Sequence, residues 1–500
     1  MRELLRGWED RIRTRKCLAF WVVCVVHFSV ALGYKHFAGI DIQADPVMNN
    51  WDAFWQTLPI DALMNNLAES MWSLHSQPPL YNLYGALLAR LFYPQQLQAM
   101  YYSNVVLGSL LCGMMYPILR QFTRREGLSF LGALLLALNP AIYLFEAYPL
   151  YTLPTAFLVV LSVFCLTLFS SHGRQRYLYA FILCLNLLVL TRSLYHLAIL
   201  FVAIPFAAIL ARRNWRKVLV GSIIISALSI GWYGKNCAKF GFFGSSSWSG
   251  LGLWKIAVLN YSTQEIDARA EQGVVERAVA DLYPYSAPSR FVEYGFDRRS
   301  DVDVLSRDDY NNINVVAISR MYGRSAIRLI ASDPLHYLWN VCGAYRTYSC
   351  PSSTYKFVAC NAEKMHVHHS ISSLVVHGHW LTTKLNRLIG RDPFCSLMYF
   401  YLPASLIVYG VGLLRESGKS LSKWRDRVRA DAVMLFSAFM ILYTTVVGCA
   451  LEYGENVRFK FPIESLLWAF IIAVVYRSVV RFGGRSPLQG APDVIRGRTG

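Results

Sequence analysis

The sequence predicts an all-α polytopic membrane protein with about ten transmembrane helices. Of its 500 residues, 55% are hydrophobic and only 16% are charged, well below the roughly 25% charged residues of soluble domains. Several apolar runs of roughly 18 to 21 residues are long enough to cross a hydrocarbon core about 30 Å thick. A large soluble core is therefore excluded.

Ten apolar segments are predicted to span the bilayer. They are 17–34, 99–119, 127–147, 152–170, 177–191, 193–211, 217–235, 394–414, 431–450 and 463–480. The first has no small-residue cleavage site, so we expect a retained span rather than a removed signal peptide. The segment 79–93 is apolar but short and contains Asn82 and Arg90. We expect it to lie along the outer membrane surface as an amphipathic helix.

The basic residues set the predicted orientation. The net charge of +18 is concentrated in short segments beside apolar runs, which is the positive-inside pattern of membrane proteins rather than a nucleic-acid surface. If 79–93 does not cross, the basic residues at 120–125, 212–217 and 415–429 all face the cytoplasm. Both termini are then expected inside.

Five regions follow from this topology. They are a cytoplasmic basic N-terminus (1–16), an N-terminal transmembrane module (17–235) with a first outer loop (35–98), an outer loop region (236–393), C-terminal transmembrane helices (394–480) and a cytoplasmic flexible tail (481–500). The region 236–393 has helical stretches at about 266–282 and 310–331, and we expect it to cap the membrane part. Long loops are translocated largely regardless of their charge. Within the first outer loop, Asp45-Pro46 is typical of a helix N-cap followed by proline at the first helical position.

The cysteines and histidines give weaker signals. Cysteines 237, 342, 350 and 360 fall in the expected outer loop, where one disulfide can form, but the sequence does not pair them. The histidines at 366, 368, 369, 377 and 379 lack the i, i+4 spacing of a helical zinc site. No metal and no cofactor are expected, with a divalent metal as the weaker alternative.

Polar residues gather at the predicted outer ends of the spans, where ionisable groups are costly and indicate function. The first outer loop contains Asp41, Asp45, Asp52 and Asp61, and the basic residues Arg192, Lys235 and Lys239 follow or end spans. The turn between the last two spans contains Glu452, Glu455, Arg458 and Lys460. Together they predict a mixed site in which cations hold an anion beside a carboxylate.

Each of these residues also has a structural alternative. Arg192, Lys235 and Lys239 can simply reach lipid headgroups. Asp45 can be only a helix cap. Glu146, at the outer end of the third span, is either an acceptor contact or a structural partner.

Four segments, in this order along the chain, resemble the GT-C superfamily of polyprenyl-phosphate-sugar-dependent glycosyltransferases. After the acidic first loop come LHSQPPLYNLY, ALNPAIYLFEAYPLYT, GWYGKNCAKFGFFGSSSWSGLGLW and ENVRFKFPIESLLWAF. The resemblance covers about residues 30–475 and is greatest to the protein O-mannosyltransferase and lipid A aminoarabinose transferase group. It differs in lacking a paired Asp-Glu at the start of the first loop, in having Gln77 before the prolines, and in having Lys235 where relatives commonly have arginine.

The resemblance implies roles for several residues. A first-loop aspartate, Asp45 or else Asp41, is the expected catalytic base. Arg458, Lys460 and Arg192 are expected to hold the lipid phosphate, with His75 and Gln77 nearby, and Lys235 and Glu146 complete the expected substrate contacts.

The expected activity is an inverting transfer of a sugar from a polyprenyl-phosphate donor to a glycan, lipid or protein acceptor at the outer face of the membrane. A single carboxylate suffices as general base on the acceptor hydroxyl, because phosphate is already a stable leaving group. The partners are the donor lipid, the acceptor and the bilayer, with no nucleic acid, and a bacterial inner membrane is the expected location. The alternatives are a flippase or other transporter of lipid-linked sugars, and a non-catalytic envelope-assembly protein.

Overall fold

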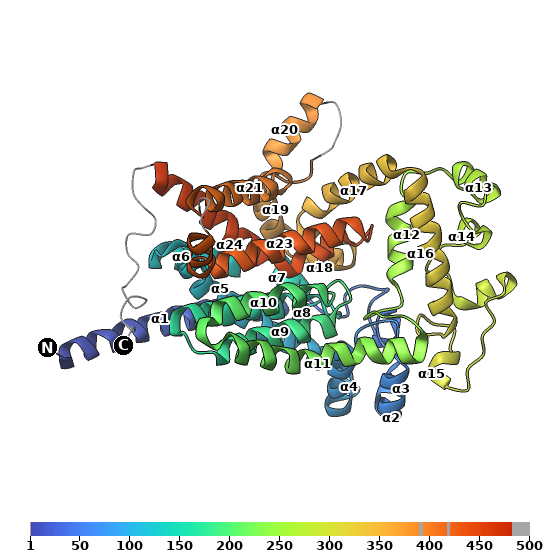
Figure 1. Cartoon of the computed structure of the whole chain (residues 1–500), viewed down its shortest axis with the longest axis horizontal. Coiled ribbons are helices and arrows are strands. Elements are labelled where there is room, and N and C mark those ends of the chain that lie inside the picture. Colours follow the sequence, from blue (N-terminus) through green and yellow to red (C-terminus); the bar gives the residue numbers. More distant parts are fainter. Residues whose placement is uncertain (1, 390–393, 418–420, 483–500) are drawn as a thin grey trace.

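The computed structural model describes residues 2–389, 394–417 and 421–482. These residues contain helices and no strand, so the predicted all-α class is confirmed. The long helices run along one common axis, and most short helices gather at one end of this bundle (Figure 1). The predicted tail 481–500 lies outside the described residues from 483 onward.

Two groups of helices make up the fold. The helices of the bundle, with the short basic helix α22 that joins two of them, are α1 (Arg2–Gly33), α5 (Gln96–Thr123), α6 (Glu126–Ala137), α7 (Pro140–Glu146), α8 (Thr152–His172), α9 (Arg176–Thr191), α10 (Ala198–Ala211), α11 (Trp215–Phe240), α21 (Met398–Ser417), α22 (Leu421–Ala430), α23 (Ala432–Ala450) and α24 (Asn456–Phe482). The helices of the loop regions are α2 (Ile60–Asn65), α3 (Leu67–Ser73), α4 (Pro79–Phe92), α12 (Ser249–Ala257), α13 (Thr263–Glu271), α14 (Arg277–Asp281), α15 (Asp303–Ser306), α16 (Asn314–Ser332), α17 (Pro334–Ser349), α18 (Ala359–Lys364), α19 (His366–Val375) and α20 (His379–Ile389).

All ten predicted spans coincide with helices. Among the described residues, seven helical stretches are long and apolar enough to cross a membrane, and the bent pair α6–α7 makes an eighth if it is one span. One stretch, Ala198–Phe240, contains two predicted spans, because α10 and α11 pack against each other on either side of the turn at Arg212–Asn214. The tenth, α9, is apolar but shorter. The chain is therefore a multi-pass membrane protein.

The third predicted span, 127–147, is broken rather than continuous. Helices α6 and α7 meet at an angle of 48°. Pro140 is the first residue of α7, a position whose N–H has no partner within the helix, so the proline costs no hydrogen bond there. The side chain of Asn139 caps the helix by accepting a hydrogen bond from the Ala141 N–H. The Asn-Pro pair therefore ends one helix and begins the next.

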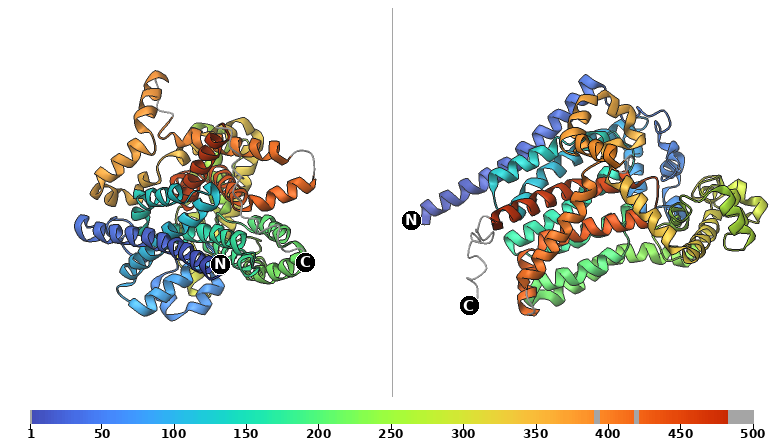
Figure 2. Two further views of the ribbon diagram at one scale, coloured as in Figure 1. Left: turned by 90° about the vertical axis from the view of Figure 1, so that its left-hand side faces the viewer. Right: turned by 90° about the horizontal axis from the view of Figure 1, so that it is seen from above.

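Basic turns meet at one end of the bundle, which we call the basic end. The first turns of α1 and the last turns of α24 both lie there (Figures 1 and 2). Arg477 forms an ion pair with Asp431 at 3.0 Å, and Arg429 donates to the Ile209 carbonyl at 3.2 Å. These contacts join turns that the positive-inside pattern places on one side.

The two predicted outer regions meet at the opposite end, which we call the loop end. Arg307 pairs with Asp61 at 2.8 Å, and the Asp41 N–H donates to the side chain of Asn361 at 3.1 Å. Helix α4 runs crosswise to the bundle at this end (Figure 1), as expected for a helix lying along a membrane surface. It starts at Pro79, again with proline at the first helical position.

The predicted helix start at Asp45-Pro46 is wrong. The Asp45 carboxylate does accept from the N–H groups of Val47 and Met48, both at 2.9 Å, but residues 45–50 form bends and not a helix. An Asp side chain makes the same local bonds in a turn as at a helix start. The following helical turn, Trp51–Ala53, is capped instead by Asn50.

One disulfide joins Cys350 to Cys395. Cys350 is one of the four outer-loop cysteines for which a disulfide was predicted, but its partner Cys395 is not among them. Cys395 stands 45 residues later, at the start of the predicted span 394–414, so the bridge ties the loop region to the bundle.

A buried polar pair joins α1 to α7 inside the bundle. His27 Nε2 lies 2.7 Å from Glu146 Oε1, with side-chain exposures of 0% and 1%. The His27 Nδ1–H donates to the Ala137 carbonyl at 2.7 Å. A Cβ at Gly108 would lie 2.1 Å from Glu146 Oε1, so a glycine at this position leaves room for the carboxyl group.

Replacing His27 with leucine is expected to destabilise the protein by about 3–5 kcal/mol, because it leaves the Glu146 carboxyl buried without a partner. Thermal unfolding of the purified protein in detergent measures this. The double variant His27→Leu/Glu146→Leu is expected to unfold at a higher temperature than His27→Leu alone. Equal melting temperatures for wild type and His27→Leu would show that the pair contributes nothing.

Candidate active site

A cavity of about 1340 Å³ opens at the loop end. Its walls come from the first outer loop, the ends of α9 and α24, and the segment that includes α12. Its lining includes five residues of the predicted site, Gln77, Arg192, Glu452, Glu455 and Arg458. Helices of the bundle therefore supply the cations, and the loops supply the rest of the enclosure.

Arg192 is a buried cation with unused donors. It directly follows α9 and is 1% exposed. Its guanidinium lies over the rings of Phe459 and Tyr151, at 4.4 and 5.4 Å from their centroids. Neither Nη1 nor Nη2 has a hydrogen-bond partner among the described residues. Because an unpaired buried charge is costly, these donors indicate a site for an anion.

Arg458 lies in the first turn of α24 and belongs to a hydrogen-bonded network on the cavity wall. Its Nε is 2.8 Å from Glu455 Oε2, and its Nη1 donates to the Tyr148 hydroxyl at 3.1 Å. The Tyr355 hydroxyl donates to the same Glu455 oxygen at 2.8 Å. Glu455 therefore balances the charge of Arg458 and holds it in place, whereas the buried Arg192 has no carboxylate partner among the described residues.

Glu452 and Lys255 form a second charged pair in the cavity. Their side chains are hydrogen-bonded and only 14% and 17% exposed. Burial raises the pKa of Glu452 to about 7, although Lys255 opposes this shift. A Cβ at Gly252 would lie 2.9 Å from Glu452 Oε2, so the absence of a side chain there gives the carboxylate its space.

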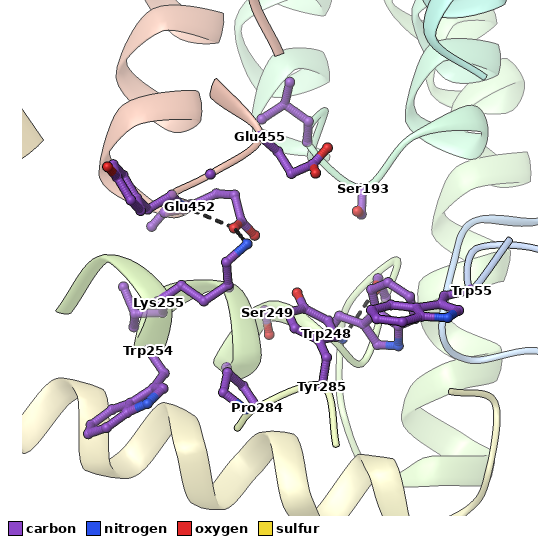
Figure 3. Close-up of a pocket in the computed structure, with 18 of the residues that line it drawn as sticks. Trp55, Ser193, Trp248, Ser249, Trp254, Lys255, Pro284, Tyr285, Glu452 and Glu455 are labelled. Atoms are coloured by element: carbon purple, nitrogen blue, oxygen red, sulfur yellow. Dashed lines mark hydrogen bonds and ion pairs between the residues drawn. The ribbon is translucent and has the colours of Figure 1, made fainter. Parts of the chain in front are cut away.

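An aromatic wall faces these charged groups, and we define it as Trp55, Trp248 and Tyr285. Figure 3 shows the wall across the cavity from Glu455 and Ser193, with the Glu452–Lys255 pair to one side. Trp55 lies 6.0 Å from Tyr285 in a stacked arrangement, and Trp248 meets Tyr285 edge-on at 5.6 Å. The wall combines the first outer loop with two parts of the region 236–393.

The two predicted residues before the prolines have different environments. Gln77 lines the cavity, and its buried Oε1 has no hydrogen-bond partner among the described residues. His75 is fully buried between the loops, with Nδ1 at 2.9 Å from the Ser247 hydroxyl and Nε2 donating to the Asn311 carbonyl at 2.7 Å. Burial lowers the pKa of His75 to about 3, so its ring is neutral and positions the loops.

The two candidate bases lie beside the cavity rather than in its lining. Val47 and Met48, which follow Asp45 closely, do line it. The Asp41 carboxylate is held by Lys35 at 2.9 Å and Gln98 at 3.1 Å. These bonds and that of the Gln43 N–H lower the pKa of Asp41 despite its partial burial. Asp41 therefore has a structural role in fixing the loop.

Three further predicted residues do not line the cavity. Lys235 donates to the Leu74 carbonyl at the end of α3 at 2.5 Å, and Lys460 donates to the Cys350 carbonyl. Glu146 pairs with His27 in the bundle, as described above. Their proposed substrate contacts stay predictions, and the bonds seen here hold loops and helices together.

Lys255 and the aromatic wall were not among the site residues predicted from the sequence. With aromatic residues at 14% of the chain, no single tryptophan stands out. In the part of the chain that the structure describes, no group of three His, Cys, Asp or Glu side chains could hold a metal ion.

The fold and the cavity define a class: a polytopic helical membrane protein with a charged, aromatic-lined site at one end of its bundle. No protein-family model and no curated protein matches the chain. It is similar to a crystal structure of ArnT from Cupriavidus metallidurans bound to undecaprenyl phosphate, with 13% identity and a TM-score of 0.32 over 93% of this chain and 77% of that one. The apo structure of the same protein gives 12% identity and a TM-score of 0.28 over 94% and 78%. Likeness at this level does not establish a function.

Proposed function

We propose that this protein is an inverting glycosyltransferase that moves a sugar from a polyprenyl-phosphate donor to an acceptor at the outer face of a bacterial inner membrane. The observation that carries the proposal is the buried Arg192, whose Nη1 and Nη2 have no partner in the part of the chain that the structure describes, at a cavity that Arg458 also lines. The order of the sequence segments that resemble the GT-C superfamily supports the same function.

The anion that fits this site is the phosphate of a lipid. Both arginines lie where helices of the bundle end at loops, which is the depth at which the headgroup of a membrane lipid meets water. A guanidinium offers a fork of donors that suits phosphate oxygens. Arg192 and Arg458 are therefore proposed to hold the donor phosphate, with Gln77 beside them.

The proposed reaction is a single displacement. The oxygen of the acceptor hydroxyl bonds to the anomeric carbon while the bond from that carbon to the phosphate oxygen breaks. The hydroxyl proton passes to a carboxylate, and the electron pair leaves with the polyprenyl phosphate. The arginines stabilise the negative charge that grows on the leaving phosphate.

The proposed base is Asp45, ahead of Asp41. A general base must be free to take a proton, and the carboxylates of Glu455 and Glu452 are already engaged by Arg458 and Lys255. Asp41 is likewise engaged by Lys35. Among the described residues, the Asp45 carboxylate bonds only to the backbone N–H groups of Val47 and Met48, and these two residues line the cavity.

Incubation of the purified protein in detergent with a radiolabelled polyprenyl-phosphate sugar and a membrane extract as acceptor source tests the function. An enzyme transfers label although no sealed membrane is present. A flippase or an assembly protein leaves all label on the donor, and that result would overturn the proposal.

Donor affinity is expected to fall as the pH rises from 6 to 8. Below its pKa of about 7 Glu452 is neutral, and above it the carboxylate is charged. The donor is a phosphodiester whose charge does not change in this window. The added negative charge is expected to raise the donor KM by roughly three- to tenfold.

The Glu452→Gln variant is the control for this pH dependence. Its donor KM is expected to stay constant between pH 6 and 8. A wild-type slope in the variant would show that another group titrates.

A further inference from the structure

The cavity is larger than the donor headgroup requires. Binding sites for drug-sized ligands occupy about 300–1,000 Å³, and this cavity encloses about 1340 Å³. One phosphate and one sugar therefore leave space for a second group of similar size. The aromatic wall and the Glu452–Lys255 pair border this space, whereas the proposed phosphate contacts come from Arg192, Arg458 and Gln77.

Trp55 presents an aromatic surface that the fold itself does not cover. It lines the cavity and is 51% exposed. Its ring is supported by Tyr310 at 4.5 Å and Tyr285 at 6.0 Å between centroids.

The support beneath Trp55 is fixed by hydrogen bonds. The Trp248 Nε1–H donates to the Tyr310 carbonyl at 3.4 Å, and the Tyr310 hydroxyl donates to the Tyr285 carbonyl. The wall is therefore positioned before any ligand arrives.

Polar groups border this wall. The Lys255 ammonium lies 5.5 Å from the ring centroid of Tyr285 and is bonded to the Glu452 carboxylate, while Glu455 lies across the cavity (Figure 3). A rigid aromatic face with a charged donor and acceptor at its edge matches a sugar ring, whose C–H face stacks on the aromatic ring while its hydroxyls bond to the charged groups.

We propose that the aromatic wall, together with Glu452 and Lys255, is an acceptor subsite that binds a sugar ring, so that the acceptor is a carbohydrate. This inference rests on the proposed function and specifies its acceptor class. The carbohydrate is either a polysaccharide or the sugar part of a glycolipid.

The product of the transfer reaction tests the acceptor class. Label from the radiolabelled donor is separated into organic-soluble glycolipid, water-soluble polysaccharide and precipitated protein. Label in either carbohydrate fraction supports the inference and identifies the source. Label confined to protein overturns it and leaves the glycosyltransferase function standing.

The Trp55→Ala variant tests the subsite. Loss of the stacking surface is expected to raise the acceptor KM by about tenfold, while the donor KM stays unchanged. The Trp55→Phe variant keeps a ring and is expected to retain most of the affinity. Trp339→Ala is the matched control, because Trp339 on α17 is 72% exposed and does not line the cavity.

An unchanged acceptor KM in a folded Trp55→Ala variant overturns the subsite. Failure of the wild type to transfer label to any fraction is a different result, because it overturns the proposed function itself. If Trp55→Ala does not fold, the Glu452→Gln variant decides: a raised acceptor KM supports the subsite, and an unchanged acceptor KM overturns it.

Discussion

Replacing Arg192 with leucine is expected to lower sugar transfer by about 10²–10³-fold, the loss that follows removal of one pre-positioned donor to a developing anion. Leucine has no donor, and its apolar side chain suits the ring contacts of the buried position. Binding of the polyprenyl-phosphate donor should weaken in parallel. Initial rates in detergent and donor binding by equilibrium filtration measure the two effects.

Arg176→Leu is the matched control for this change. Arg176 is the first residue of α9 and is exposed, whereas Arg192 follows the other end of the same helix. The control is expected to retain wild-type rates. Wild-type donor binding by Arg192→Leu would show that this guanidinium does not contact the phosphate.

The Asp45→Asn variant is expected to lose about 10²–10⁴-fold in transfer rate, the usual contribution of a general base. An asparagine keeps a side-chain oxygen that can accept from the N–H groups of Val47 and Met48, so the turn should persist. Donor binding and the melting temperature should stay at their wild-type values. Steady-state rates at saturating donor give the comparison.

Asp52→Asn serves as the control for the base. Asp52 lies in the same loop and its carboxylate accepts from the Ile60 N–H at 2.9 Å, so a small effect on transfer is expected. If both Asp45→Asn and Asp41→Asn keep full activity, the first-loop assignment fails. Glu452→Gln and Glu455→Gln would then identify the base among the carboxylates that line the cavity.

The bundle could be predicted from sequence because its determinants are local. Length and hydropathy locate each span, and the basic turns at 120–125, 212–217 and 415–429 separate the two ends. The break at Asn139–Pro140 is also a local signal, since proline at a first helical position follows from its missing N–H. The segment 127–147 was nevertheless predicted as one continuous span, because hydropathy does not register a bend.

The site could be predicted only in part. Arg192 and Arg458 were identified because charged residues at span ends are costly wherever the chain folds. Their neighbours decide their state, and no spacing in the sequence shows that Glu455 neutralises Arg458 while the Nη atoms of Arg192 stay unpartnered. Lys460, two residues after Arg458, turns to a carbonyl of the loop region instead.

Long-range contacts account for what the sequence did not reveal. Trp55 and Tyr285 stand 230 positions apart in the chain, and the wall forms only when the loop regions meet. His27 likewise bonds to Glu146, which lies 119 positions further along the chain. The helix start predicted at Asp45-Pro46 was wrong for a local reason instead, because an Asp side chain makes the same bonds in a turn as at a helix start.

A cryo-electron microscopy map of the protein with polyprenyl phosphate bound tests the central claim most directly. The account predicts phosphate density between the guanidinium groups of Arg192 and Arg458, inside the cavity at the loop end. Phosphate density at Lys235 and Lys239 beside α3, with none at the two arginines, would contradict it.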